Sequence, residues 1–217
     1  AYAQLSRAHV LLYFSHYDHS EERLDMAKQA VDKAFELNPN LPEAHLALGE
    51  YYYRGHLDHD RALEQFAIVR KSQPNNSELL SLIGFTQRRQ GKFEQALANL
   101  KRASELNPLP RQIYHVALTC YLMRRYAEAE CYYDRVISLA PDMPGAYSGK
   151  AGIYLRREGS TEKAREVVEE AIKSTQSPFI DLLIWLDIYD RNYQEALDRL
   201  SLKSDDVDSI WRFLPNA

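Results

Sequence analysis

Apolar residues recur every three to four positions between residues 79 and 103 and predict two consecutive helices. The first predicted helix carries Leu79, Leu80, Leu82, Ile83 and Phe85, and the second carries Phe93, Ala96, Leu97, Leu100 and Ala103. Gly91 separates them, because glycine tolerates a positive φ at the end of a helix. Pro108 closes the segment, because the residue before a proline disfavours helical geometry.

The same pattern returns along the chain with a period near 34 residues. Pro39, Pro74, Pro108 and Pro141 follow one another at intervals of 35, 34 and 33 residues. Two further series share this period, namely the alanines at 27, 62, 96, 129, 164 and 196 and the small residues Gly49, Gly84, Ala117 and Gly152. A glycine inside a helix costs about 1 kcal/mol relative to alanine. The sequence therefore predicts repeated helix pairs in which small residues allow the two helices to approach closely.

These residues resemble the motif of the tetratricopeptide repeat, a helix–turn–helix unit of about 34 residues. The third repeat matches through Ile83, Gly84, Gly91, Phe93, Ala96, Leu100, Ala103 and Pro108, and the second matches through Leu48, Gly49, Tyr52, Ala62, Phe66 and Pro74, with one extra residue in its "RGHLDHD" turn. The resemblance implies an all-α fold, a right-handed superhelical solenoid of antiparallel helix pairs with about six repeats.

We expect a single solenoid domain over residues 1–217, with repeats at about 1–40, 41–75, 76–109, 110–142, 143–177 and 178–203. The fifth repeat has Gln176 where the family has proline, and the sixth is degenerate. Residues 204–217 show an apolar stripe that predicts a capping helix or the start of a further repeat.

In this family the first helices line the concave side, and the resemblance implies a non-catalytic interaction scaffold that binds a peptide or helix of a protein partner there. The partner-binding residues expected on that side are Glu50, Tyr53, Phe85, Arg88, Tyr114, Leu118, Tyr121 and Arg156. Aromatic residues and arginine are enriched in binding hot spots. The charged residues with which one subfamily clamps a C-terminal carboxylate are absent from the matching positions, so a more hydrophobic or mixed ligand is expected.

The formal net charge of −4 gives no reason to expect nucleic acid as a partner. No apolar run is long enough to span a bilayer, so we expect no membrane insertion. Two cysteines are too few for a disulfide framework and favour a reducing compartment, which we expect to be the cytoplasm. The sequence begins at Ala1 inside a predicted helix, so we expect a fragment of a longer chain.

Other readings of the chain stay open. Self-assembly through the terminal repeats is one alternative, which would make the protein a homo-oligomer. A second resemblance, to tetratricopeptide arrays appended to bacterial nucleotide cyclases and protein kinases, implies a sensing or docking region of a larger signalling enzyme. No nucleophile–base or acid–base constellation is present, so we expect neither catalysis nor a cofactor.

Two short motifs, "HYDH" at 16–19 and "HLDH" at 56–59, occupy matching turns. Imidazoles are plausible metal ligands, which makes His16, His19, His56 and His59 candidates. Asp18, Ser20 and Asp60 also fit as caps of the second helices, and we favour that interpretation over a metal site.

Overall fold

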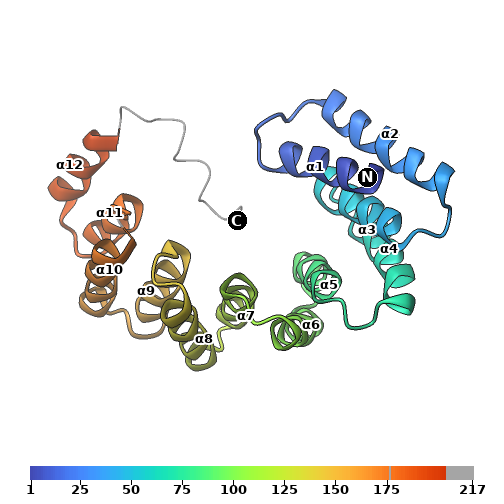
Figure 1. Ribbon diagram of the computed structural model, residues 1–217. Coiled ribbons are helices and arrows are strands. Elements are labelled where there is room, and N and C mark those ends of the chain that lie inside the picture. Colours follow the sequence, from blue (N-terminus) through green and yellow to red (C-terminus); the bar gives the residue numbers. More distant parts are fainter. Residues whose placement is uncertain (176, 204–217) are drawn as a thin grey trace. The chain divides into compact units, whose positions relative to one another are not determined.

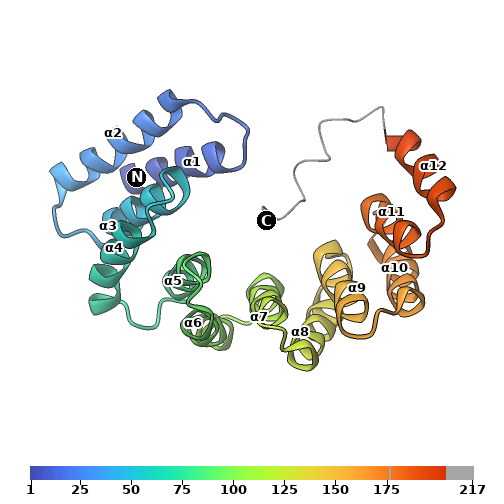
Figure 2. The ribbon, with the colours of Figure 1, turned by 180° about the vertical axis from the view of Figure 1, so that it is seen from behind.

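The computed structural model describes residues 1–175 and 177–203, and every regular element in that part of the chain is a helix (Figures 1 and 2). The predicted capping helix at 204–217 and the position of Gln176 lie outside the described residues. In chain order the elements are α1 (Tyr2–Phe14), α2 (Glu21–Leu37), α3 (Pro42–Glu50), the π-helix η1 (Tyr51–Gly55), α4 (His59–Ser72), α5 (Ser77–Arg89), α6 (Phe93–Leu106), α7 (Pro110–Leu122), α8 (Tyr126–Leu139), α9 (Pro144–Glu158), α10 (Thr161–Thr175), α11 (Ile180–Tyr189) and α12 (Tyr193–Lys203).

The chain divides into two compact units, an N-terminal unit of residues 1–119 and a C-terminal unit of residues 120–217. The division falls inside α7, and whether the chain is one domain stays a prediction. In the N-terminal unit α1 packs on α2, α3 on α4, and α5 on α6. In the C-terminal unit α9 packs on both α8 and α10, and α11 packs on α12. The predicted all-α fold of helix pairs is confirmed.

Small residues lie where the two helices of a pair come closest. The six alanines of the recurring series, at 27, 62, 96, 129, 164 and 196, are 0–6% exposed. A Cβ added to Gly84 would lie 2.7 Å from Leu100 Cγ and 3.2 Å from the carbonyl oxygen of Ala96. Gly49 meets the ring of Phe66 in the same way. The predicted role of Gly49 and Gly84 is therefore confirmed, and the helical cost of Gly84 is offset by close packing.

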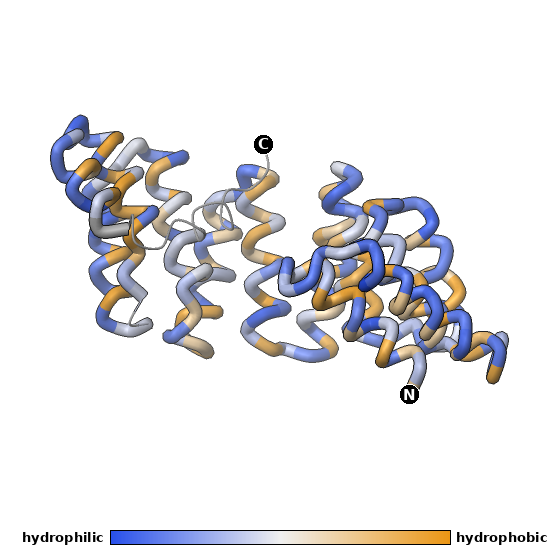
Figure 3. Tube along the Cα trace, turned by 90° about the horizontal axis from the view of Figure 1, so that it is seen from above, coloured by the Kyte–Doolittle hydropathy of each residue, from blue (hydrophilic) through white to orange (hydrophobic). Residues whose placement is uncertain are grey.

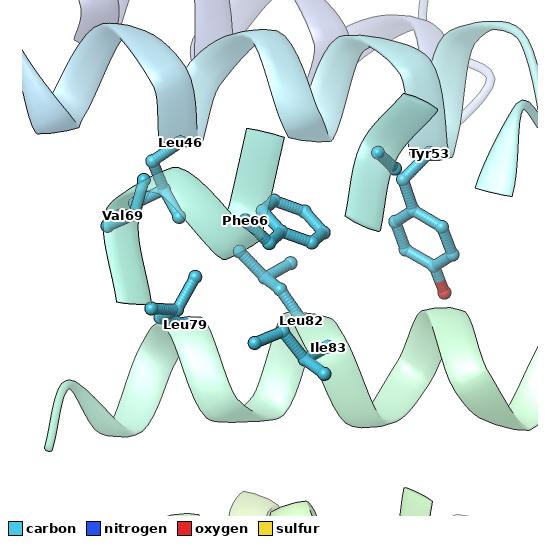
Figure 4. Packing of buried hydrophobic residues seen from close by; sticks show 8 residues of the cluster. Leu46, Tyr53, Phe66, Val69, Leu79, Leu82 and Ile83 are labelled. Atoms are coloured by element: carbon cyan, nitrogen blue, oxygen red, sulfur yellow. The ribbon is translucent and has the colours of Figure 1, made fainter. Parts of the chain in front are cut away.

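The core runs between successive pairs. In the N-terminal unit one cluster joins α3, α4 and α5 (Figure 4), and it contains Leu46, Tyr53, Ala62, Phe66, Val69, Leu79, Leu82 and Ile83. Hydrophobic and hydrophilic positions are intermixed along the helices, as Figure 3 shows. Helices such as α6 and α10 therefore bury one stripe of their surface and leave polar residues on another.

A residue in the left-handed conformation lies in each of the six turns within helix pairs. Its φ lies between 54° and 75°, and the residues are His16, Leu57, Gly91, Arg124, Gly159 and Arg191. The prediction for Gly91 is confirmed. Four of the six turns use a non-glycine residue, although that conformation costs roughly 1–2 kcal/mol for residues with a Cβ.

The turns have two lengths. In the third repeat the N–H of Lys92 donates to the carbonyl of Gln87, five positions earlier. In the second repeat Asp58 donates to Tyr52, six positions earlier. The extra residue recognised in the sequence thus lies in the longer turn, and the first helix of this repeat ends in the π-helix η1. A π-helix is rare and occurs mostly as a single turn within an α-helix.

Replacing Gly84 by alanine tests the close approach. The gain in helix propensity is about 1 kcal/mol, but overpacking a core costs about 1–3 kcal/mol, so we expect Gly84→Ala to lower the free energy of unfolding by up to about 2 kcal/mol. Urea denaturation measures this change. In a Leu100→Ala background part of the cost should disappear, because the new methyl then meets only the carbonyl oxygen of Ala96. An equal cost in both backgrounds would contradict the packing explanation.

Candidate functional site

Ion pairs link three first helices of the N-terminal unit. Arg7 on α1 donates from Nε to Glu50 Oε1 on α3 at 2.7 Å, and it also pairs with Glu78 on α5. Glu50 is 2% exposed and pairs a second time with Arg54 of η1, at 3.2 Å. An unpaired buried carboxylate would be costly, so the two arginines stabilise Glu50 in this position. The Arg54 guanidinium lies 5.4 Å from the ring centroid of Phe14 on α1.

The structure therefore places two of the eight predicted partner-binding residues in the interior of the unit. Glu50 is enclosed by Arg7 and Arg54, and Tyr53 is 8% exposed and packs in the same core cluster as Phe66 (Figure 4). Their contact with a partner stays a prediction. Sequence reasoning missed Arg7, which lies in the repeat whose first helix matches the family motif least.

Three other predicted residues come together in what we call the Phe85–Tyr114 patch, formed by Phe85 and Arg88 of α5 with Tyr114, His115 and Thr119 of α7. The rings of Phe85 and His115 meet edge to face at 4.4 Å between centroids, and Tyr114 and His115 meet at 5.5 Å. The Arg88 guanidinium lies 5.6 Å from the Phe85 ring centroid, and Nη1 donates to Thr119 Oγ1 at 3.2 Å.

The members of this patch are held in place, and all except the buried Thr119 keep accessible surface. Phe85, Arg88 and Tyr114 are half-buried, and so is Leu118, the fourth predicted residue of this region, on α7. Burial raises the pKa of Tyr114, while the positive charge of Arg88 opposes that shift. The phenol therefore stays neutral at physiological pH. Sequence reasoning missed His115 and Thr119, which both lie on α7. The His115 ring packs against Phe85 and Tyr114, and Thr119 accepts a hydrogen bond from Arg88.

In the C-terminal unit the predicted residues Tyr121 and Arg156 form a pair. The Arg156 guanidinium lies 5.3 Å from the ring centroid of Tyr121. Burial raises the pKa of Tyr121, and the charge of Arg156 opposes that shift. A Cβ added to Gly152 would come within 2.9 Å of Tyr121 Oη, so this glycine makes room for the tyrosine.

This placement corrects the role assigned to Gly152. The small residue that packs against the second helix of the fifth repeat is Ala151, which is buried in one cluster with Ala164 and Val168. The physical reason is a longer turn, because the N–H of Ser160 bonds to the carbonyl of Tyr154, six positions earlier. The close contact therefore falls one residue earlier in the chain than the spacing to Gly159 suggests.

The four candidate histidines lie in two turns whose backbones differ. The rings of His16 and His19 are 4.7 Å apart, and His19 Nδ1 is 3.0 Å from the carbonyl oxygen of Tyr13. His56 meets the ring of Tyr51 at 4.6 Å, and His59 lies 6.1 Å from Tyr53. Among the residues that the structure describes, no group of three or more histidine, cysteine, aspartate or glutamate side chains is arranged to hold a metal ion.

The acidic and hydroxyl residues of these turns serve as caps. Ser20 accepts from the N–H of Arg23 at the start of α2, and Asp58, rather than the expected Asp60, accepts from the N–H of Arg61 at the start of α4. Asp18 accepts hydrogen bonds from Ser20 and Arg23. These contacts stabilise the helix N-termini, since capping satisfies otherwise unpaired backbone donors.

The tetratricopeptide repeat family matches residues 77–108 and 121–179 of this chain. The tetratricopeptide repeat-containing protein trd-1 of Caenorhabditis elegans is 28% identical over 153 residues, which cover 70% of this chain and 19% of that protein. BBS4 of Bos taurus, described as a BBSome complex member, is 30% identical over 166 residues, which cover 76% of this chain and 31% of that protein. The chain thus spans less than a third of the length of these two relatives.

Solved structures share the fold across most of the chain. The structure described in the functional characterization of Pseudomonas aeruginosa pilF has a TM-score of 0.69 at 22% identity and covers 96% of this chain and 95% of its own. YrrB, described as a TPR protein with an unusual peptide-binding site, has a TM-score of 0.61 at 21% identity and covers 84% of this chain and 88% of its own.

In the described part of the chain no helix combines the length and the apolar character that crossing a membrane requires. The recurring alanines, the tightly packed helix pairs, the family matches at 77–108 and 121–179 and the relatives all point to one family. The chain belongs to the tetratricopeptide repeat family.

Proposed function

We propose that this protein is a non-catalytic scaffold that binds an extended or helical segment of a partner protein on its first helices. The fold is one that generally serves protein–protein interaction, and the Phe85–Tyr114 patch is the observation that carries the finer proposal. It joins an aromatic ring, a guanidinium and a phenol on two neighbouring first helices. Such groups dominate binding energy when they are held rigidly and remain partly exposed.

His115, the residue of the patch that packs against both Phe85 and Tyr114, is uncharged. Burial and the positive charges of Arg88 and Arg111 together lower the pKa of His115 to about 3. The imidazole is therefore neutral at physiological pH and acts as an uncharged support for Phe85 and Tyr114. A partner that meets this surface finds Arg88 as its nearest charge, which suits an apolar or aromatic segment with an acidic residue beside it.

Tyr121 and Arg156 provide a second contact of the same chemistry in the C-terminal unit. The Phe85–Tyr114 patch and the Tyr121–Arg156 pair lie in different units, and each is proposed as a contact independently of the other. Two names among the similar proteins agree with this function, since BBS4 is described as a complex member and YrrB as having a peptide-binding site.

We extend the proposal to location and parent chain. Neither Cys120 nor Cys131 forms a disulfide, which agrees with a reducing compartment such as the cytoplasm. A docking surface is also what such an array would contribute to a longer signalling protein.

Alanine at Arg88, Tyr114 and Tyr121 tests the binding surface. Each truncation of a hot-spot residue costs about 1–3 kcal/mol, so we expect at least a tenfold weaker affinity with unchanged helical content. Pull-downs from a lysate, quantified by mass spectrometry, identify a partner that the triple variant loses. Calorimetry with a peptide from that partner then measures the affinity.

A matched control removes the same residue types elsewhere, at Arg70, Tyr17 and Tyr193, which lie on second helices or in a turn. This control variant should keep the partner. If the first-helix variant captures the same proteins with the same affinity as the wild type, the assignment of these three residues is wrong.

The buried imidazole predicts acid sensitivity. The unfolded chain takes up a proton at His115 below about pH 6.5, while the folded chain does not until about pH 3, so the free energy of unfolding falls as the pH drops through this window. The effect approaches about 1.4 kcal/mol per pH unit for one proton. Urea denaturation at several pH values should show a shallower decline for His115→Asn than for the wild type. Parallel curves would show that His115 is not held neutral by the fold.

A second candidate function is self-association through α1, favoured by three exposed leucines. Leu5, Leu11 and Leu12 are 47%, 51% and 38% exposed, and Leu5 and Leu12 lie two turns apart on one face of α1. Exposed apolar surface often marks an interface. Light scattering should then show a mass that rises with concentration, and Leu5→Glu with Leu12→Glu should keep the chain monomeric. Leu37→Glu, at an exposed position on α2, is the control. A monomeric mass at every concentration rules this function out.

A further inference from the structure

The π-helix of the second repeat borders a pocket that the proposed function does not use. Its volume is about 400 Å³, within the range of about 300–1,000 Å³ typical of small-ligand sites. It lies in the N-terminal unit, and its lining residues are Lys28 of α2, Tyr51 and Tyr52 of η1, His56 and Asp58 of the following turn, and Arg61 of α4. None of them belongs to the Phe85–Tyr114 patch.

The first helix of the second repeat ends in the π-helix η1, and the turn after it is closed by the bond from Asp58 N–H to the carbonyl of Tyr52 at 3.0 Å. This places Tyr51 and Tyr52, consecutive residues of η1, on the wall of one pocket. The π-helix is less stable than an α-helix and occurs frequently at functional sites.

The wall of the pocket is aromatic and firmly held. Tyr51 packs in a core cluster with Val10, Leu24 and Ala27. Its ring meets His56 edge to face at 4.6 Å and Tyr52 at 5.6 Å. A rigid aromatic wall of this kind offers a flat apolar ligand a contact at little cost in conformational entropy.

The polar groups of the pocket are mainly nitrogen donors. Each of the two cations of the lining pairs with one carboxylate. Lys28 donates to both oxygens of Asp32 at 2.8 and 2.7 Å, and Asp58 accepts from the backbone N–H of Arg61 at 3.0 Å and lies 3.4 Å from Arg61 Nε. An ammonium has three donors and a guanidinium has five, so both cations have donors beyond these pairs, and such donors suit an oxyanion.

Arg61 is placed to bind that oxyanion. Its guanidinium lies 5.6 Å from the Tyr52 ring centroid, its Nε lies 3.4 Å from Asp58 Oδ2, and the side chain is 65% exposed. Stacking and the ion pair orient the guanidinium, whose planar fork matches carboxylate and phosphate oxygens. We propose that the pocket binds an aromatic ring that carries a phosphate or carboxylate, with the ring against Tyr51 and Tyr52 and the oxyanion on Arg61 and Lys28.

The test is an NMR titration of the ¹⁵N-labelled full chain with phenyl phosphate, phenylacetate and inorganic phosphate. At least one aromatic probe should shift the amide signals of Gly55, His56 and Arg61 in a saturable way, and inorganic phosphate should bind at least tenfold more weakly. Comparison of the two aromatic probes identifies whether phosphate or carboxylate is preferred. Equal binding of inorganic phosphate and the aromatic probes, or no saturable shift with either aromatic probe, overturns the proposal.

Variants assign the binding to this pocket. Arg61→Gln should weaken the preferred aromatic probe at least fivefold, and Tyr52→Leu should weaken it while leaving the response to inorganic phosphate unchanged. Arg70→Gln, a neutralised arginine near the other end of α4, is the matched control and should bind like the wild type. Circular dichroism verifies that each variant is folded. Unchanged affinity in folded Arg61→Gln shows that the pocket is not the site and overturns the proposal.

Discussion

The close approach of two helices at a small residue is the constraint on which each repeat depends. At Gly84 an added methyl would meet the backbone oxygen of Ala96 as well as the side chain of Leu100. A side chain can change rotamer, but a helix backbone cannot give way without moving the whole helix. The distance between α5 and α6 is therefore fixed by the backbone. Each pair then behaves as a rigid block, and the first helix of every block presents a defined face.

Much of the fold could be predicted because the constraint leaves a periodic trace in the sequence. Spacing does not decide the local backbone. In the second repeat the extra residue lengthens the turn, as the sequence suggests, but nothing in the spacing shows that the first helix ends in the π-helix η1. In the fifth repeat Ala151 and Gly152 are both small, so the pattern fits either of them. The choice is made by packing, since Val168 lies with Ala151 and Tyr121 lies against Gly152.

The candidate binding site, like the fold, could be predicted in part from the sequence. Phe85 corresponds in the repeat register to Leu118, and Tyr114 corresponds to Ser81. Phe85 and Tyr114 therefore lie one helical turn apart in register on matching faces of successive first helices, which the repeat period brings together. The burial of Glu50 could not be foreseen, because it depends on how far the Arg7 side chain reaches from α1 to α3 and α5. The repeat period predicts where the helix backbones lie. The partners of long charged side chains depend instead on which opposite charges they can reach and on the cost of leaving a buried charge unpaired.

The turns within the helix pairs can change in length and backbone conformation more easily than the helix contacts can change in spacing. Residues with different chemistry can therefore be placed in the turns without disturbing the helix packing. Turns closed over five and six residues coexist in one chain, because a longer loop adds little to the entropy of closure. "HYDH" and "HLDH" share three of four letters, yet the left-handed residue is His16 in one turn and Leu57 in the other. Only the second motif follows a π-helix and contributes His56 and Asp58 to the pocket lining. The chemistry of these residues is thus set by the backbone that carries them, and a motif repeated in sequence need not be a site repeated in function.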